Sequence, residues 1–165
     1  MCSSDLLDVA DYRTFFKVKP PLRDEEDRIA VVEAVASGLI DIICSMHTPQ
    51  DEESKRLPFE EAASGAVGLE TLLPAALRLV HAEMMDLPTL WRALSLNPAQ
   101  RLGLPGGRIA VGAPADLVLF NPDAPFVLDR STLRSKSRNT PFDGMRMQGK
   151  VMATYVAGSC VYEAN

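Results

Sequence analysis

Apolar residues recur at helical spacing in the first hundred residues of the chain. After Asp24 the acidic run Glu25-Glu26-Asp27 suits a helix N-terminus, and Gly38 suits a helix end. The spacing predicts a helix between them with an inward stripe of Ile29, Val32, Val35 and Ala36. A second helix is predicted over residues 68–81, with inward-facing Leu69, Leu72, Leu73, Ala76, Leu77 and Val80. Shorter helices are predicted after Asp86, with Leu90, Trp91 and Leu94 packed, and after Asn97.

Two short apolar runs predict strands. Phe15–Val18 is the first, and Ile40–Cys44 is the second and is expected to be buried. Strand, helix and strand in this order are typical of a βα unit in a parallel sheet. Residues 46–66 then form a long polar stretch, and loops of roughly 20 residues in compact domains are often functional.

The character of the chain changes near residue 103, where Gly, Pro and short β-type runs take over. These runs predict a small antiparallel sheet from Arg108–Val111, Asp116–Phe120, Phe126–Leu128, Gly149–Val156 and Cys160–Tyr162. Ala157-Gly158-Ser159 predicts the turn of a hairpin. We therefore place a boundary near residue 103, which divides the chain into residues 1–102 and 103–165.

Composition narrows the function classes. The chain has 165 residues, of which 47% are apolar and 24% charged, and a net charge of −5, as expected of a folded globular protein. An acidic chain without a large basic cluster disfavours nucleic acid and anionic membranes as partners. No apolar run reaches about 18 residues, and the first residues lack a signal-peptide pattern. Three widely spaced cysteines favour a reducing cytoplasm and exclude a cysteine zinc cluster.

Candidate chemistry concentrates around one of the two histidines. His81 ends a predicted helix, where a histidine usually caps carbonyls or faces solvent. His47 follows the predicted strand Ile40–Cys44, and catalytic groups collect at the carboxyl ends of strands in βα barrels. A lone histidine is not a metal site, and the nearby acidic run Asp51-Glu52-Glu53 is usually a solvated face. No HxH, HExxH, CxxC, G-x-S-x-G or phosphate-loop motif is present.

A second candidate is the locally basic run Arg134–Arg138, which leads into Asn139-Thr140-Pro141-Phe142. The run could form a phosphate site. It could equally be a polar connection in which Asn-Thr-Pro turns the chain. Both interpretations stay open at this point.

Several segments in order resemble the dihydroorotases of the amidohydrolase superfamily. The resemblance covers about residues 15–162. Its most specific elements are Pro20-Pro21-Leu22-Arg23, Val67-Gly68-Leu69-Glu70-Thr71 and Asn139-Thr140-Pro141-Phe142. Further elements are Ile40–Ile43, Ser95–Ala99, Gly107–Ile109, Gly112–Val118 and Gly149–Val151. The Ala-Asp-Leu-Val part alone is common to many amidohydrolases and carries little weight.

The resemblance implies a (β/α)8 barrel that holds two zinc ions, with a small β-sandwich beside it. For this chain it implies an α/β fold: the C-terminal part of a TIM-type amidohydrolase barrel over residues 1–102, followed by a β-sandwich portion over residues 103–165. Family chains are more than twice as long, and their earlier strands supply an HxH pair, a bridging carboxylate and two histidines. These ligands are missing here, so we expect this chain to bind no zinc. An incomplete barrel leaves an unpaired strand edge, so we also expect the chain to be either truncated or in need of a partner that covers this edge.

The resemblance also assigns site positions residue by residue. In the family the strand matching Ile40–Cys44 leads into Thr-Asp-His-Ala-Pro-His, whose aspartate binds metal and shuttles the proton; that position is Met46. His47 is kept and is only a weak metal candidate, and the final substrate-binding histidine is Gln50. Two further substrate contacts fall on Lys19, in place of asparagine, and on Ser64-Gly65, in place of Phe-Gly. A thioether has no proton to exchange, so catalysis at Met46 is expected to be lost.

Three functional hypotheses follow. The first is a non-catalytic dihydroorotase-like protein that acts as a structural partner of aspartate carbamoyltransferase, as inactive homologues in the family do. The second is an active hydrolase of another cyclic amide or imide in a longer parent chain, with a metal on His47 and Asp51 or Glu52 and an anionic substrate on Lys19. The third is a remnant of a longer gene without an independent function. We expect an oligomer for the longer parent and a cytoplasmic location.

Overall fold

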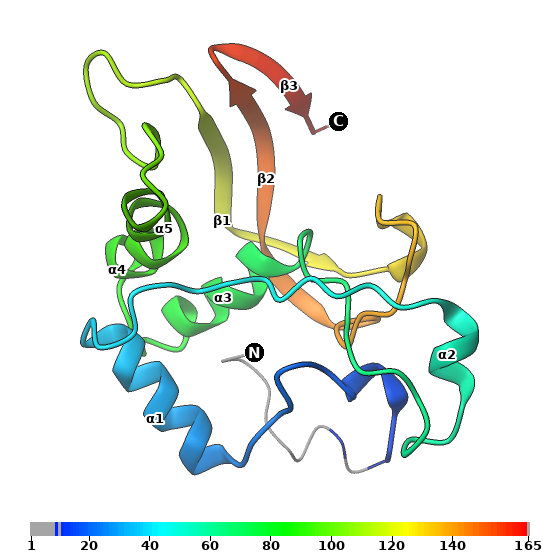
Figure 1. The fold of residues 1–165 in the computed structure, drawn as a ribbon. Helices are drawn as coiled ribbons and strands as arrows, with labels where there is room; N and C mark the ends of the chain where they lie inside the picture. The colour runs from blue at the N-terminus through cyan, green and yellow to red at the C-terminus, as the bar shows by residue number, and fades with distance from the viewer. Residues whose placement is uncertain (1–8, 10, 165) are drawn as a thin grey trace.

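The computed structural model describes residue 9 and residues 11–164, and it places a small sheet over a group of helices (Figure 1). The helical elements are η2 (Thr14–Phe16), α1 (Glu25–Ala36), α2 (Glu52–Arg56), α3 (Leu72–His81), α4 (Leu87–Trp91), η3 (Arg92–Leu96), α5 (Asn97–Arg101) and η4 (Arg130–Thr132). The strands are β1 (Leu117–Val127), β2 (Arg146–Val156) and β3 (Ser159–Glu163). Among the described residues, no helix is long and apolar enough to cross a membrane.

Helix α1 begins where the sequence predicts. The Asp24 side chain accepts a hydrogen bond from the Asp27 backbone N–H at 2.9 Å, and the acidic first turn complements the helix dipole. Val32 and Val35 are buried, but Ile29 and Ala36, predicted to face inward, are exposed. The buried stripe is narrower than predicted because α1 packs on the core along one side only.

The main core lies between α1, α3 and the helical run from α4 to α5. Leu77 of α3 and Leu90 of α4 are fully enclosed and pack with Val32 and Val35 of α1. Elements α4, η3 and α5 follow one another without a break, so the two short helices predicted there form one continuous helical run. Asp86 caps this run by accepting from the Thr89 N–H at 2.8 Å.

The three strands form one antiparallel sheet in the order β1-β2-β3. The hairpin turn at Ala157-Gly158 joins β2 to β3 and confirms the prediction. Strand β1 merges the two predicted runs Asp116–Phe120 and Phe126–Leu128, with an irregular register between Asn121 and Pro125. Proline lacks a backbone donor and is tolerated here because β1 is an edge strand.

The sheet packs on the helices at two close contacts. The ring of Trp91 stacks on Phe120 of β1, with centroids 5.1 Å apart and planes at 9°. Gly149 of β2 has φ +102, and a Cβ there would lie 2.3 Å from Leu77 Cδ1 of α3. A glycine is required at this position because it lets α3 lie directly against β2. The predicted boundary near residue 103 follows α5 and stays a prediction.

Three predicted strands are not formed among the described residues. Phe15–Val18 contains the 3₁₀ turn η2 instead, and Phe16 and Val18 pack into a small core with Leu22 and Ala66. Ile40–Cys44 is partly exposed and forms no strand, because the Ile40 and Ile43 N–H groups donate to the carbonyls of Ala34 and Ala93, at 2.9 and 3.1 Å, instead of to a neighbouring strand. A single parallel bridge, between His47 and Ala66, is the remaining parallel pairing. The third run, Arg108–Val111, is an exposed loop.

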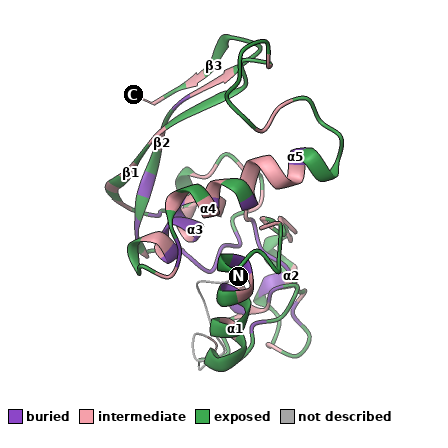
Figure 2. Cartoon of the chain, turned by 90° about the vertical axis from the view of Figure 1, so that its left-hand side faces the viewer, coloured by how far each residue is buried: buried purple, intermediate pink, exposed green. Residues whose placement is uncertain are grey.

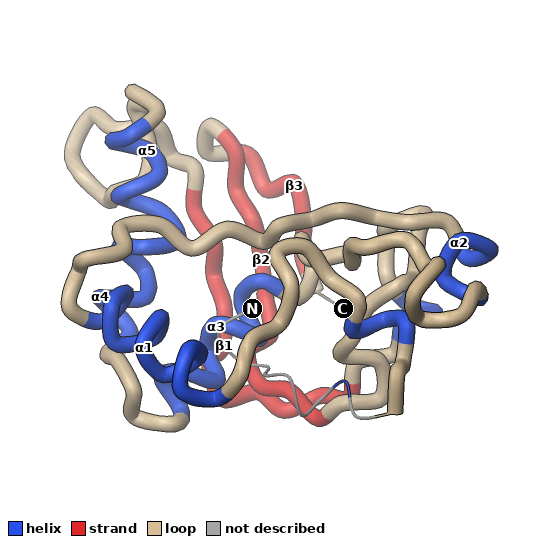
Figure 3. Tube along the Cα trace, turned by 60° about the horizontal axis from the view of Figure 1, so that its bottom comes forward, coloured by secondary structure: helices blue, strands red, loops and turns tan. Residues whose placement is uncertain are grey.

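The long polar stretch between α1 and α3 is mostly loop (Figure 3). It contains one short helix, α2, which Asp51 caps by accepting from the Ser54 N–H at 2.8 Å. The acidic run Asp51-Glu52-Glu53 is therefore a helix start, and its side chains are solvent-exposed as predicted. The second predicted helix begins at Leu72 rather than at residue 68.

Candidate functional site

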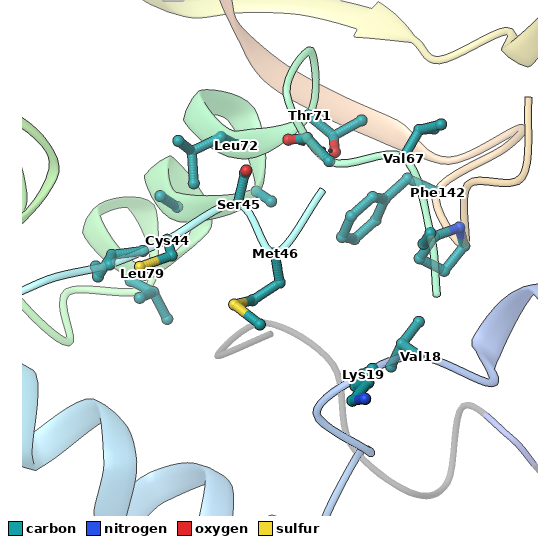
Figure 4. A pocket seen from close by; sticks show the side chains of 16 residues that line it. Val18, Lys19, Cys44, Ser45, Met46, Val67, Thr71, Leu72, Leu79 and Phe142 are labelled. Atoms are coloured by element: carbon teal, nitrogen blue, oxygen red, sulfur yellow. Dashed lines mark hydrogen bonds between the residues drawn. The ribbon is translucent and has the colours of Figure 1, made fainter. Parts of the chain in front are cut away.

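A pocket opens beside α3 where the segment after Ile43 passes over the helix (Figure 4). It has a volume of about 60 Å³ and is partly open to solvent. Its walls are mostly apolar and come from α3, from residues 66–68 and from Phe142. Lys19 and Met46 both line it, so the structure brings together two of the positions that the resemblance assigns to the site.

Met46 has an unusual backbone. Its φ is +47, and its side chain is 46% exposed. Left-handed backbone is costly for a residue with a long side chain, whereas Asp and Asn adopt it more readily. Its carbonyl accepts from the Thr48 hydroxyl at 2.9 Å, but the thioether has no hydrogen bond among the described residues. Met46 thus occupies a conformation that suits aspartate or asparagine better than it suits methionine.

His47 is used by the backbone. Its Nδ1 accepts from the Gly68 N–H at 3.0 Å and from the Leu69 N–H at 3.4 Å. Because Nδ1 accepts, only Nε2 is left for any ligand. The imidazole therefore connects the loop after Met46 to the segment that leads into α3, and its role in this structure is structural.

Asn139 connects three segments close to the pocket. Its Oδ1 accepts from the Gln50 N–H at 3.2 Å, and its Nδ2 donates to the Gly65 carbonyl at 3.0 Å. Its own carbonyl accepts from the Val67 N–H at 3.0 Å. Asn139 is only 3% exposed, so these bonds replace water for both amide groups.

Gly65 shows why the residue beside Asn139 has no side chain. It has φ +138, and a Cβ would lie 2.4 Å from the Thr48 carbonyl oxygen. Its N–H donates to the Lys17 carbonyl at 2.9 Å. Gly65 is buried, whereas its neighbour Ser64 is exposed and lies outside the pocket lining. The predicted Ser64-Gly65 contact therefore does not reach the pocket in this structure.

Gln50 and the basic run line a different hollow. Gln50 lies there with Asp51, Glu52, Lys136 and Arg138 rather than with Met46. Arg134 turns away, and its guanidinium lies 5.0 Å from the centroid of the Tyr162 ring. The backbone N–H groups of Arg134 and Ser135 donate to the Glu70 carboxylate at 3.0 and 3.1 Å. These hydrogen bonds favour the interpretation of this run as a polar connection.

The residues present do not fit a two-zinc centre. Within residue 9 and residues 11–164, no group of three or more His, Cys, Asp or Glu lies together to hold a metal ion. Asp51 caps α2, and this hydrogen bond from Ser54 lowers the pKa of its carboxyl. Glu52 pairs with Arg56 at 2.8 Å. The acidic groups nearest His47 in sequence are therefore engaged elsewhere.

Two lysines fasten the loop to the N-terminal segment. Lys55 is 2% exposed, and its Nζ donates to the Thr14 and Lys17 carbonyls, both at 2.9 Å. In return, Lys17 Nζ donates to the carbonyls of Phe59 and Glu60, both at 2.8 Å. Burial, with a smaller contribution from nearby Lys17, lowers the pKa of Lys55 to about 8. Sequence reasoning missed Lys55 because a lysine in a polar stretch gives no signal of burial.

Known proteins of similar sequence bear on the resemblance. The Amidohydrolase family description matches residues 17–161. Over 155 residues the chain is 44% identical to a dihydroorotase from Desulforapulum autotrophicum, covering 94% of this chain and 36% of that protein. It is 42% identical over 154 residues to a dihydroorotase from Wolbachia sp. subsp. Drosophila simulans, covering 93% and 35%. These matches confirm the resemblance to dihydroorotases that the sequence motifs indicate.

The structure is also similar to that of a solved hydantoinase. It superposes on the L-hydantoinase (dihydropyrimidinase) from Arthrobacter aurescens with a TM-score of 0.91 and 33% identity. The match covers 97% of this chain and 37% of the hydantoinase. The chain thus spans about a third of the length of the relatives it matches.

Proposed function

The chain belongs to the amidohydrolase family, and from that premise we propose that it is a non-catalytic, dihydroorotase-like protein that acts as a structural partner of aspartate carbamoyltransferase. The reaction of the dihydroorotases is the reversible ring closure of carbamoyl aspartate to dihydroorotate in pyrimidine biosynthesis. In this proposal the chain supports that pathway by assembly rather than by chemistry. We also propose that it works in the cytoplasm, as part of an oligomer.

The observation that carries the proposal is Met46. It lies in the pocket at φ +47, at the sequence position where the family has its metal-binding, proton-shuttling aspartate. A thioether has no exchangeable proton and is a weak ligand for zinc beside the usual nitrogen, oxygen and thiolate donors. A methionine at this position supports a retained scaffold over a working active site.

The neighbouring positions support the same proposal. His47, which matches the family motif, spends its Nδ1 on two backbone N–H groups. Lys19 and Gln50, which depart from the family residues, have no side-chain hydrogen bond among the described residues. No observation favours the rival metal site on His47 with Asp51 or Glu52, because Asp51 caps α2 and Glu52 pairs with Arg56 of the same helix.

Exposed apolar side chains support an assembly role. In the loop after α5, Ile109 is 92% exposed and Val111 is fully exposed. Strands β1 and β3 are also largely exposed (Figure 2). Apolar surface of this kind is a usual feature of protein interfaces. We further propose that the sheet β1-β2-β3 belongs to the family's β-sandwich and that this surface is covered in the assembled protein.

Sedimentation velocity with the aspartate carbamoyltransferase of the same organism tests the proposal. We expect a faster-sedimenting complex, and we expect the double variant I109K/V111K to weaken it, since both side chains are solvent-exposed and cost the fold little. The matched control, Met46→Asp, should bind as the wild type does. Two species that sediment independently at every concentration would sink the partner assignment.

A further inference from the structure

We propose that the pocket between Lys19 and Met46 binds a small monoanion with an apolar body, such as an aryl-alkyl carboxylate. This inference concerns a ligand of the free chain. It rests on the lining of the pocket and does not depend on the partner proposed above. No bond is made or broken in it.

The walls of the pocket suit an apolar body. Leu79 of α3, Val67 and Phe142 line it and are 3%, 5% and 4% exposed, and Leu72 completes the side formed by α3. Figure 4 shows these side chains around the space in which Met46 lies. The thioether of Met46 is flexible and polarizable, so it can adapt to an aromatic ring or an alkyl chain. The apolar body of a ligand would gain van der Waals contact with these side chains.

Each of the two hydroxyl groups in the pocket makes one hydrogen bond within the chain. Ser45 Oγ accepts from the His47 N–H at 3.3 Å, and Thr71 Oγ1 donates to the Gly68 carbonyl at 3.4 Å. A polar ring that entered the pocket would therefore lose hydrogen bonds to water without replacing them all. This penalty selects against ligands whose polar groups are spread over the whole molecule.

The charge of the pocket is set by one residue. Among the described residues, Lys19 is the only lysine, arginine or histidine in the lining, and no carboxylate from this part of the chain lines the pocket. Its ammonium has no hydrogen bond or ion pair among the described residues. One exposed cation beside apolar side chains suits a ligand with one anionic group on an apolar body. A second carboxylate would lie against apolar side chains and lose its hydration without gaining a partner.

The test is a titration of the full chain, without added metal, with 4-phenylbutyrate and with its neutral amide. Binding is followed by NMR of methionine methyl groups, with Met46 assigned through Met46→Leu, and by calorimetry. We expect the acid to shift the Met46 methyl resonance and to bind at least about tenfold more tightly than the amide. Lys19→Met, which keeps an apolar stem, should remove this preference.

A matched variant keeps the charge argument falsifiable. Lys150→Met removes an exposed lysine from β2, away from the pocket, and should leave acid binding unchanged. The inference is overturned if the acid and the amide bind equally, if phenylsuccinate binds more tightly than the monoacid, or if Met46 does not respond. It is also overturned if Lys19→Met retains the preference. These outcomes are separate from the sedimentation result, because no partner is present.

Discussion

Two neighbouring segments of this molecule differ in what their side chains do for the fold. Both polar atoms of the Asn139 side chain are hydrogen-bonded in the interior. The Met46 side chain makes no hydrogen bond among the described residues and is 46% exposed. The Asn139 side chain supports the backbone of its neighbours, whereas the Met46 side chain lines the pocket and is partly open to solvent.

The same division holds at the other positions. Gly65, His47 and Glu70 are each tied to another segment by a close backbone approach or by backbone N–H groups. The side chains of Lys19 and Gln50 support no other segment by a hydrogen bond in the described part of the chain. A buried group that loses its partner costs the fold far more than a pocket-facing group that changes, so we expect substitutions at Gly65 and Asn139 to cost more stability than substitutions at Lys19 and Met46.

The largest expected effect is at Gly65. Gly65→Ala should lower the free energy of unfolding by about 3 kcal/mol or more, because the new Cβ meets the Thr48 carbonyl at a strained positive φ. Gly38→Ala is the matched control, since Gly38 has φ +79 with nothing within 4 Å, and it should cost only about 1 kcal/mol. Urea unfolding measures both. Equal losses would show that backbone conformation alone, without the close approach, fixes Gly65.

Asn139→Ala comes next. It leaves the Gln50 N–H and the Gly65 carbonyl without their partner, so we expect a loss of about 2–3 kcal/mol in the free energy of unfolding. Asn121→Ala removes an exposed asparagine that accepts one bond from the Asp123 N–H, and should cost well under about 1 kcal/mol. If both variants unfold at the same urea concentration, Asn139 contributes no more to stability than an exposed asparagine, which would contradict the account.

Lys55 should give the scaffold a pH dependence. Its pKa is lowered to about 8 in the folded chain, so between about pH 8 and its ordinary 10.5 the unfolded state binds more protons. Stability should therefore rise with pH across this window, by at most about 1.4 kcal/mol per pH unit, while below it the cost of burying the charge is fully present. The neutral amine keeps two N–H groups for the Thr14 and Lys17 carbonyls.

The check is the free energy of unfolding from pH 7 to pH 10.5 in the wild type and in Lys55→Met. The difference between the two should change along this range, because the other titrating groups are common to both. Lys150→Met, which removes an exposed lysine, should follow the wild type. A constant difference between the wild type and Lys55→Met would contradict a shifted lysine.

The smallest expected effect is a gain at Met46. Met46→Asn should raise the free energy of unfolding by about 0.5–1 kcal/mol, because asparagine tolerates left-handed backbone better than methionine. Met152 is similarly exposed, at 40%, but lies in β2, where Met152→Asn should be neutral or destabilising. Thermal unfolding of the two variants measures the difference. A loss of stability at Met46 would show that the methionine is well accommodated there.

Much of the fold could be predicted from local patterns. The cap of α1 at Asp24, the cap of α4 at Asp86 and the hairpin at Ala157-Gly158 depend on nearby residues and were correctly predicted. Ile40–Cys44 was wrongly predicted as a strand because strand formation depends on a hydrogen-bonded neighbour, which a local apolar run does not reveal. Arg108–Val111 failed for the same reason.

The candidate site was predictable only in part. Sequence motifs pointed to Met46 and Lys19, which share the pocket, but they also grouped Gln50 and Ser64 with them, and these lie elsewhere. The burial of Asn139 could have been suspected from its specific motif. Lys55 could not, because its two carbonyl partners lie about 40 residues earlier in the sequence. Long-range contacts of this kind carry no local signal.

The most direct test of the central claim is a turnover assay with dihydroorotate. The full chain and its Met46→Asp variant are assayed with added zinc, beside an active dihydroorotase as positive control. The account predicts no turnover by either protein, because Met46 cannot shuttle a proton and the described residues supply no further cluster of metal ligands. Zinc-dependent turnover by the wild-type chain would contradict it.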